Sequence, residues 1–314
     1  MSTLCATPPR SSVSLAATLA LLAACAPASS QAASESSLPP AATGPPEIAF
    51  VGASVTAGFR LADHDDMFSN MRARAEQVLG RELSDEEYER RTDSVAPGDV
   101  LAAVSGRSVE SFGDTMLFAS PERIARRVLE KGLETGADTV VGVDLMFWFG
   151  YGRVDDGGDE REERLALQRL GFDLLDELAS GAPDVSFVLG DYPDLSRALP
   201  AMITPDMIPD AKTRKELNRR LAVWADERPN VSVFPISRSL DAVTRGTVRL
   251  GDGSGGRAID LESAFQLAMV HPTRLGTAYL VRDLAKFLRG LEEPPVEIPR
   301  ARDAAFLEAA GVRR

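Results

Sequence analysis

The residues of this sequence best suited to chemistry are a serine near the start and a histidine near the end. Ser54 follows Gly52 and Ala53 directly after a short apolar run. In parallel α/β sheets, ligands bind at the carboxyl ends of the strands, where this serine would stand. A serine hydroxyl needs an imidazole that accepts its proton and returns it to a leaving group. His64 and His271 are the two histidines that could supply it.

The two histidines differ in their surroundings. His64 lies in the acidic segment 63–66, so we expect a solvated side chain, although its closeness to Ser54 in the sequence keeps it as an alternative base. His271 precedes Pro272, which holds it extended ahead of the last helical pattern. A single His-Pro in a loop is usually structural, so the assignment of His271 as the base depends on its pairing with Ser54.

The segment 52–58 excludes three better-defined motifs. It lacks the Gly-Lys-Ser/Thr ending of a phosphate-binding Walker A loop, and it has two of the three glycines of a dinucleotide fingerprint. A nucleophile elbow needs glycine two residues after the serine, where this chain has Thr56. A plain strand-to-helix connection or a phosphate cradle remains open for these residues taken alone.

Two segments resemble blocks of a known family. Residues 50–58, Phe-Val-Gly-Ala-Ser-Val-Thr-Ala-Gly, look like the first block of SGNH/GDSL hydrolases, and residues 271–276, His-Pro-Thr-Arg-Leu-Gly, look like their last block. The resemblance implies a single α/β domain with a three-layer, flavodoxin-like fold, in which Ser54 and His271 form the catalytic pair. It also implies an oxyanion site built from the Ser54 amide, a glycine amide, for which Gly113 is the candidate, and an asparagine side chain.

The chain departs from the family pattern at three positions. The acid three residues before the histidine is replaced by Ala268, and the aspartate usual after the first glycine is replaced by Ala53. Residues 144–150 replace the block that carries the asparagine donor. A serine–histidine dyad can still work, because the third group orients and stabilises the imidazole while the other two perform the transfer.

Another carboxylate could take over the missing role. Asp144 ends the third predicted strand at the same sheet edge, so we expect it to orient His271, with a strand-end cap as the alternative; Asp260 and Glu262 are weaker candidates. The aromatic run 147–152 would lie at this edge too, where it either lines an acyl or sugar subsite or packs in the core.

Alternating patterns predict the elements that position these residues. Five short apolar runs rich in β-branched residues alternate with segments of helical period, which is typical of a parallel sheet with crossover helices. The predicted strands are 48–51, 108–112, 139–143, 185–189 and 231–234. Ser120-Pro121 indicates a helix start, and apolar stripes indicate helices around 167–178, 217–224 and 275–287. The charged segment 63–99 predicts one or two inserted helices that could overhang a site.

The pattern of the first 46 residues predicts export and membrane anchoring, and these residues are not expected to belong to the folded domain. Residues 1–24 have the pattern of a signal peptide, and Leu-Ala-Ala-Cys at 22–25 resembles a bacterial lipobox, which would make Cys25 the acylated first residue. An ordinary signal peptide cleaved nearby is the alternative. Residues 25–46 are rich in Ala, Ser, Pro and Gly and predict a flexible tether. Residues 47–314 remain for the hydrolase domain.

Composition excludes several partners. The formal net charge is −12, and no basic stripe interleaved with aromatics indicates nucleic-acid binding. We expect membrane contact through acyl chains at Cys25 rather than through the acidic surface, and neither a metal nor an organic cofactor. The sequence therefore favours an exported, envelope-anchored esterase or deacetylase that acts on a small-molecule, lipid or glycan ester. A degenerate domain that binds carbohydrate or lipid without turnover, and an acyltransferase that acts on envelope polysaccharide, are the alternatives.

Overall fold

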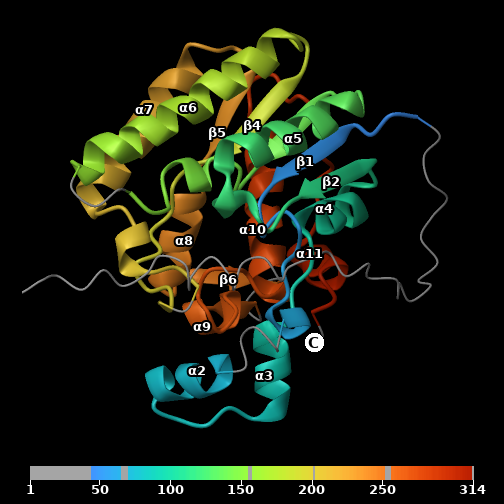
Figure 1. Ribbon diagram of the computed structural model, residues 1–314. Coiled ribbons are helices and arrows are strands. Elements are labelled where there is room, and N and C mark those ends of the chain that lie inside the picture. The colour runs from blue at the N-terminus through green and yellow to red at the C-terminus, as the bar shows by residue number, and fades with distance from the viewer. Residues whose placement is uncertain (1–43, 65–69, 155–157, 201, 252–255, 313–314) are drawn as a thin grey trace, which may run out of the picture. The chain divides into compact units, whose positions relative to one another are not determined.

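A parallel sheet forms the centre of the computed structural model, which describes residues 44–64, 70–154, 158–200, 202–251 and 256–312 (Figure 1). Its strand order is β2-β1-β3-β4-β5, the flavodoxin-like order. Each of the five predicted strands is present, with ends that differ by at most one residue. The strands are β1 (Ile48–Gly52), β2 (Val109–Gly113), β3 (Thr139–Gly142), β4 (Ser186–Gly190) and β5 (Val231–Phe234).

Helices cover both faces of this sheet, which gives the three layers that the resemblance implies. One face carries α5 (Pro121–Glu134), α6 (Glu160–Ser180) and α7 (Ala211–Asp226). The other carries α4 (Pro97–Ser105), α10 (Arg274–Arg289) and α11 (Asp303–Ala309). Helix α8 (Ile236–Thr244) follows β5, and an antiparallel pair, β6 (Val248–Leu250) and β7 (Arg257–Ile259), precedes the short helix α9 (Leu261–Ala264).

The side chains of β1 show how the layers are joined. Ala49 and Val51 pack with the α5–α7 side, while Ile48 and Phe50 pack with the α4–α10 side. All four side chains are fully buried, because successive strand residues point to opposite faces and both faces are covered. This double burial explains why β1 is a continuous apolar run in the sequence.

The start of α5 lies where the sequence predicts it, but without the expected capping bond. Helix α5 begins at Pro121, as the Ser120-Pro121 pair predicts, but the Ser120 side chain makes no capping hydrogen bond. Helix α10 begins after Thr273, whose hydroxyl accepts a hydrogen bond from the Gly276 amide at 3.2 Å. This cap lies two residues after His271 and fixes the start of α10 at Arg274.

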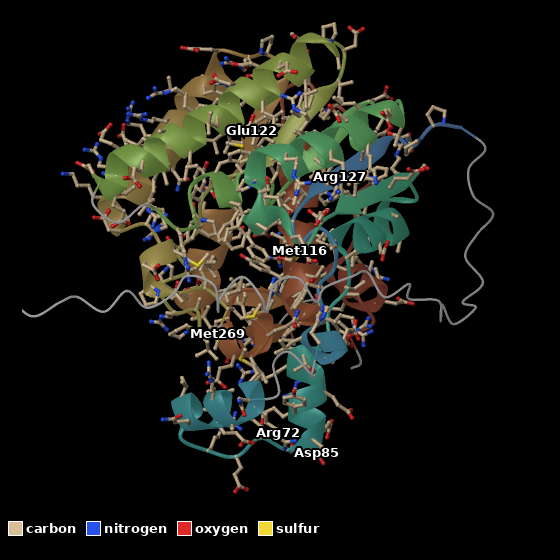
Figure 2. All side chains as sticks on the ribbon, viewed as in Figure 1. Arg72, Asp85, Met116, Glu122, Arg127 and Met269 are labelled. Carbon is tan, nitrogen blue, oxygen red and sulfur yellow. The ribbon has the colours of Figure 1, made fainter. Side chains whose placement is uncertain are left out.

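The inserted segment forms two helices outside the three layers, α2 (Met71–Leu79) and α3 (Asp85–Thr92) (Figure 1). Arg72 Nη1 donates to Asp85 Oδ1 at 2.8 Å, which ties α2 to the start of α3 (Figure 2). The apolar side of the insertion packs on Leu267 and Ala268, next to the loop that carries His271. The insertion therefore lies beside the predicted site.

The export prediction falls outside this part of the molecule. The predicted signal peptide, Cys25 and all but the last three residues of the predicted tether lie outside the described residues. Within the described ranges, no helix is long and apolar enough to cross a bilayer.

Candidate active site

Ser54 and His271 meet at the sheet edge where the strand order reverses. Ser54 follows β1, which lies between β2 and β3 in the sheet, and ligands of open α/β sheets bind at such a switch point. His271 Nε2 lies 2.8 Å from Ser54 Oγ. This distance is within the range for proton transfer between a nucleophile and its base. The structure thus brings together the two residues that the sequence paired.

The loop before α10 holds His271 by its backbone. The Gln266 amide donates to the His271 carbonyl at 2.8 Å, and the Met269 amide donates to the Gln266 carbonyl at the same distance. Met269, labelled in Figure 2, has a φ of 57°, a left-handed backbone conformation that is uncommon for residues other than glycine. The loop therefore turns sharply just before His271 and presents its ring to Ser54.

Burial sets the protonation state of His271. The side chain is 5% exposed, and this desolvation, together with the nearby His64, lowers the pKa of His271 from 6.5 to about 3. An imidazole with this pKa is neutral near pH 7. His271 is therefore in the form that can accept the Ser54 proton.

Asp144 does not occupy the position of the predicted acid. Its Oδ1 accepts hydrogen bonds from the Ala53 amide at 3.0 Å and the Thr56 hydroxyl at 2.6 Å. Its Oδ2 accepts from the amides of Val55 at 2.8 Å and Thr56 at 3.2 Å. Both oxygens are thus used by the turn that carries Ser54. This corrects the expectation that Asp144 orients His271: it holds the turn that carries Ser54, as a form of the strand-end cap considered as the alternative.

The net effect of its surroundings is to raise the pKa of the Asp144 carboxyl group. Burial raises the pKa of this carboxyl group, and its four hydrogen bonds act in the opposite direction. Gly52 makes room for the arrangement, because a Cβ at that position would lie 2.1 Å from Asp144 Oδ1. The glycine before the nucleophile is therefore required by the carboxylate that fixes the turn.

The Ser54 amide is available as a hydrogen-bond donor, as the predicted oxyanion site requires. Its neighbours Ala53, Val55 and Thr56 donate to Asp144, whereas the Ser54 N–H donates no hydrogen bond to any residue that the structure describes. A free amide at the nucleophile is what a tetrahedral oxyanion needs. Gly113, the second candidate, ends β2 and packs closely on Ala57 of the same turn, where a Cβ would lie 2.3 Å from the Ala57 nitrogen.

The other candidate acids are also engaged away from His271. Asp260 Oδ1 caps α9 by accepting from the Ser263 amide at 2.8 Å, and Glu262 lies 3.5 Å from Arg81 and 3.7 Å from Arg91. Among the described residues, no carboxylate makes a hydrogen bond with His271.

The position of the family's usual acid is apolar. The Ala268 side chain is 1% exposed and belongs to a cluster with leucine and methionine side chains of the insertion and of the neighbouring loops. Leu61, Met71, Leu83, Leu199 and Leu267 are among its members. An aspartate at this position would bury its charge among alkyl groups, so the insertion and the alanine are physically consistent with each other.

The aromatic ring of Phe59 packs against the His271 imidazole and restricts its orientation. Its ring centroid lies 4.3 Å from that of His271, with the planes tilted by 31°. His64 stacks on Phe59 at 4.7 Å and is partly buried, which differs from the solvated side chain expected from its acidic neighbours. His64 makes no hydrogen bond with Ser54 among the described contacts, so the structure supports His271 as the base.

Gln266 fixes the position of Phe59. Its Oε1 accepts from the Leu61 amide at 2.9 Å, and its Nε2 donates to the carbonyls of Phe59 at 2.7 Å and Pro272 at 3.0 Å. The side chain is fully buried, so these bonds are shielded from water. Phe59 and Gln266 were not identified from the sequence. The signal for Gln266 is a polar amide inside the apolar run 264–270.

A pocket of about 110 Å³ opens beside Ser54. Phe147 and Trp148 line it, whereas Phe149 and Tyr151 are buried in the core, so the aromatic run divides between the two roles considered for it. Most other lining residues are apolar and come from strand ends, α8 and the α9–α10 region. They include Val143, Leu195, Ile236, Leu240, Val243, Phe265, Val270 and Leu280.

Among the described residues, no group of three or more His, Cys, Asp or Glu side chains has the arrangement of a metal site. The described groups at the sheet edge are a hydroxyl, an imidazole and backbone amides next to an apolar pocket.

No family model matches this chain, and no curated protein matches it. Among solved structures, a protein provisionally described as a platelet activating factor from Streptococcus pneumonia is 13% identical, with a TM-score of 0.42 over 78% of this chain and 85% of that one. A gut microbial diltiazem-metabolizing enzyme is 10% identical, with a TM-score of 0.43 over 77% of this chain and 46% of that one.

A protein provisionally described as a GDSL-like lipase from Parabacteroides merdae is 13% identical, with a TM-score of 0.36 over 87% of this chain and 100% of that one. Likeness at this level carries no argument about activity. The fold assignment depends on the strand order and layers described above, and the functional argument depends on the geometry around Ser54.

Proposed function

We propose that this protein is a serine-dependent ester hydrolase in which Ser54 is the nucleophile and His271 the general base. The observation that carries the proposal is the 2.8 Å contact between His271 Nε2 and Ser54 Oγ, at a sheet edge that also offers a free amide and a pocket. A neutral imidazole within hydrogen-bond reach of a serine hydroxyl is the arrangement in which a base activates a nucleophile.

The reaction would proceed in two steps. His271 Nε2 accepts the Ser54 proton as Oγ attacks the ester carbonyl, and the Ser54 amide stabilises the resulting oxyanion. His271 then donates that proton to the leaving alcohol, and an acyl group remains on Oγ. In the second step His271 accepts a proton from water, the hydroxide oxygen attacks the acyl carbon, and the carboxylic acid departs as Ser54 regains its proton.

The missing carboxylate lowers the expected rate. When His271 accepts a proton it becomes a buried cation, and no carboxylate among the described residues compensates it. Removing the orienting acid costs about 10⁴ in kcat in serine proteases. The enzyme is therefore expected to be slow on generic esters, and contacts with its own substrate must supply part of the difference.

The location of the activity is a separate part of the proposal. The signal-like residues 1–24 and the lipobox-like 22–25 support export and acylation of Cys25. The protein would then act at the cell envelope, joined to a membrane by its acyl chains. Radiolabelled palmitate incorporated into the wild-type protein and not into Cys25→Ala would support this; equal incorporation into both would contradict it.

Hydrolysis of chromogenic esters tests the catalytic proposal. Wild-type protein is expected to hydrolyse 4-nitrophenyl esters, and Ser54→Ala and His271→Ala are each expected to reduce kcat by at least about 10³. Ser180→Ala is a matched control, because Ser180 lies at the exposed end of α6 and bonds only to the Glu177 carbonyl. Activity that survives Ser54→Ala would contradict the assignment.

A second candidate function is binding of a carbohydrate or lipid without turnover. Two observations favour it: no carboxylate among the described residues bonds His271, and the surroundings of Ala268 are apolar. An uncompensated imidazolium is a weak catalyst. This candidate predicts that wild-type and Ser54→Ala protein bind an ester with equal affinity and that neither releases product over hours.

A further inference from the structure

The pocket beside Ser54 ends at a wall that it shares with a second hollow. Ser239 of α8 and Tyr279 of α10 line both the first pocket and the second hollow, which lies between the same two helices. No other described residue is common to both linings. These two side chains are therefore the partition between the two spaces.

We propose that the pocket holds the acyl chain of the ester substrate and that Tyr279, supported by Ser239, sets the longest chain accepted. The substrate class would be esters of aliphatic acids rather than acetyl esters. The inference depends on the proposed hydrolysis for its kinetic consequences, while the binding of an aliphatic chain can be measured without hydrolysis.

The lining supports an aliphatic occupant. Leu240, Val243, Phe265 and Leu280 present alkyl and aromatic surfaces. The polar lining residues Asp144, Asp191 and Ser239 are hydrogen-bonded to other protein groups. Asp191, for example, accepts hydrogen bonds from the Ser237 amide at 2.7 Å and from the Ser237 hydroxyl. A chain that leaves water for such a surface gains about fourfold in affinity for each methylene buried.

The position of His271 assigns the pocket to the acyl side of the ester. The leaving alcohol must receive its proton from His271 Nε2, so it departs next to that ring. Ser54 lines the pocket, and so do Val270 and Pro272 on either side of His271, whereas His271 itself is not among the described lining residues. The chain in the pocket therefore stays attached to Ser54 through the acyl intermediate, and the alcohol lies on the other side.

The wall formed by Tyr279 and Ser239 is buried and held by polar contacts on its other side. Tyr279 is 6% exposed, and the Arg282 guanidinium lies 4.9 Å from its ring centroid. The Ser239 hydroxyl donates to Asp283 Oδ2 at 3.0 Å. Beyond the wall, the second hollow is lined by the charged groups Arg238, Asp283 and Lys286 and by apolar residues that include Phe234 and Phe287. An aliphatic chain thus meets a buried ring at the wall, and the charged groups past it disfavour further extension.

A binding experiment tests the pocket independently of catalysis. Ser54→Ala protein is titrated calorimetrically with methyl esters of acids from two to twelve carbons. Affinity is expected to rise about fourfold per carbon over the middle of the series and then stop rising. Equal affinity for all members would overturn the inference, whatever the catalytic activity of the wild type.

A kinetic experiment tests whether the pocket holds the acyl side or the alcohol side of the ester. Wild-type protein is assayed on 4-nitrophenyl esters with increasing acyl length and on acetate esters with increasing alcohol length. A kcat/KM that rises only with acyl length supports the assignment, and a rise only with alcohol length overturns it. If chains bind to Ser54→Ala but the wild type hydrolyses none of these esters, the hydrolase proposal fails and the chain-binding pocket stands.

Two variants change the pocket in opposite directions. Tyr279→Ala opens the wall and is expected to move the longest accepted chain up by at least two carbons, whereas Tyr279→Phe keeps the ring and the original limit. Leu280→Phe fills the pocket and is expected to lower the octanoate-to-acetate ratio of kcat/KM at least tenfold. Because Leu280→Phe removes no buried group, it tests the pocket even if Tyr279→Ala fails to fold. A ratio unchanged by Leu280→Phe would overturn the inference.

Discussion

The ring centroid of Phe59 lies 4.3 Å from that of His271. No carboxylate among the described residues makes a hydrogen bond with this histidine. Phe59 is placed there by Gln266, which bonds the Phe59 carbonyl and the Pro272 carbonyl with the same amide group. The loops after Ser54 and before α10 are thereby joined around the imidazole. Among the described residues, the ring contact with Phe59 and the burial of the side chain are what restrict the His271 imidazole.

Removing this ring should affect His271 without touching Ser54. Phe59→Ala is expected to lower kcat about 10- to 100-fold, because the imidazole gains freedom and water reaches it. The same water should raise the pKa of His271 toward 6.5, so the pH profile of kcat/KM should shift upward. Phe59→Leu keeps the bulk and is the matched control. A Phe59→Ala profile identical to that of the wild type would show that the ring only fills space.

The wild-type pH profile follows from the same burial. Activity needs neutral His271, and its pKa is lowered to about 3, so kcat/KM is expected to stay constant between pH 5 and 8. Protonation would reduce the rate only as the pH falls toward the lowered pKa. Initial rates with an ester of pH-independent solubility, measured where the protein remains folded, check this. A decline with an apparent pKa near 6.5 would indicate that His271 is solvated in the working enzyme.

Asp144 should stabilise the nucleophile turn rather than tune the base. Asp144→Asn replaces one of two acceptor oxygens with an amide that faces N–H donors, so the free energy of unfolding should fall by about 2 kcal/mol. The reactivity of Ser54 should fall with it, while the apparent pKa of His271 stays low. Denaturant unfolding and pH–rate profiles measure the two effects.

Asp210→Asn is a suitable control for Asp144→Asn, because Asp210 caps α7 through the Thr213 amide and does not contact the Ser54 turn. A shift of the His271 pH profile in Asp144→Asn, with stability unchanged, would instead assign Asp144 to the base.

Restoring the family's usual acid should not restore a triad. Ala268→Asp buries a carboxylate in the apolar cluster under the insertion, which is expected to cost roughly 3 to 5 kcal/mol of stability and to give no gain in kcat. Ala268→Asn has nearly the same volume without the charge and should cost less. Thermal unfolding and ester hydrolysis of both variants decide the matter. A stable Ala268→Asp protein with a higher kcat would mean that the new carboxylate reaches His271.

The parts of this molecule that the sequence predicts are those set by local pattern. The strands are short runs buried on both faces, so composition alone marks them, and Ser54 is located because it follows the first of these runs. Its pairing with His271 was expected from a family resemblance. The contact itself depends on the order of the strands, which places β1 at the switch point.

The parts that the sequence missed depend on side-chain direction and on contacts across the chain. Asp144 stands at the expected edge, but strand-end position does not determine whether a carboxylate turns toward the base or toward the neighbouring turn. Gln266 and Phe59 are separated by more than 200 residues in the chain, and their contact arises from two loops whose conformations no local pattern specifies. The wall of the pocket likewise combines α8 and α10.

Site-specific labelling with a fluorophosphonate probe tests the central claim most directly. The probe phosphonylates a serine only when a neighbouring base activates it. Mass spectrometry of the wild-type protein is predicted to show the adduct on the peptide that contains Ser54, with labelling lost in Ser54→Ala and strongly slowed in His271→Ala. A wild-type protein that remains unlabelled, or one labelled equally well after His271→Ala, would contradict a Ser54–His271 dyad.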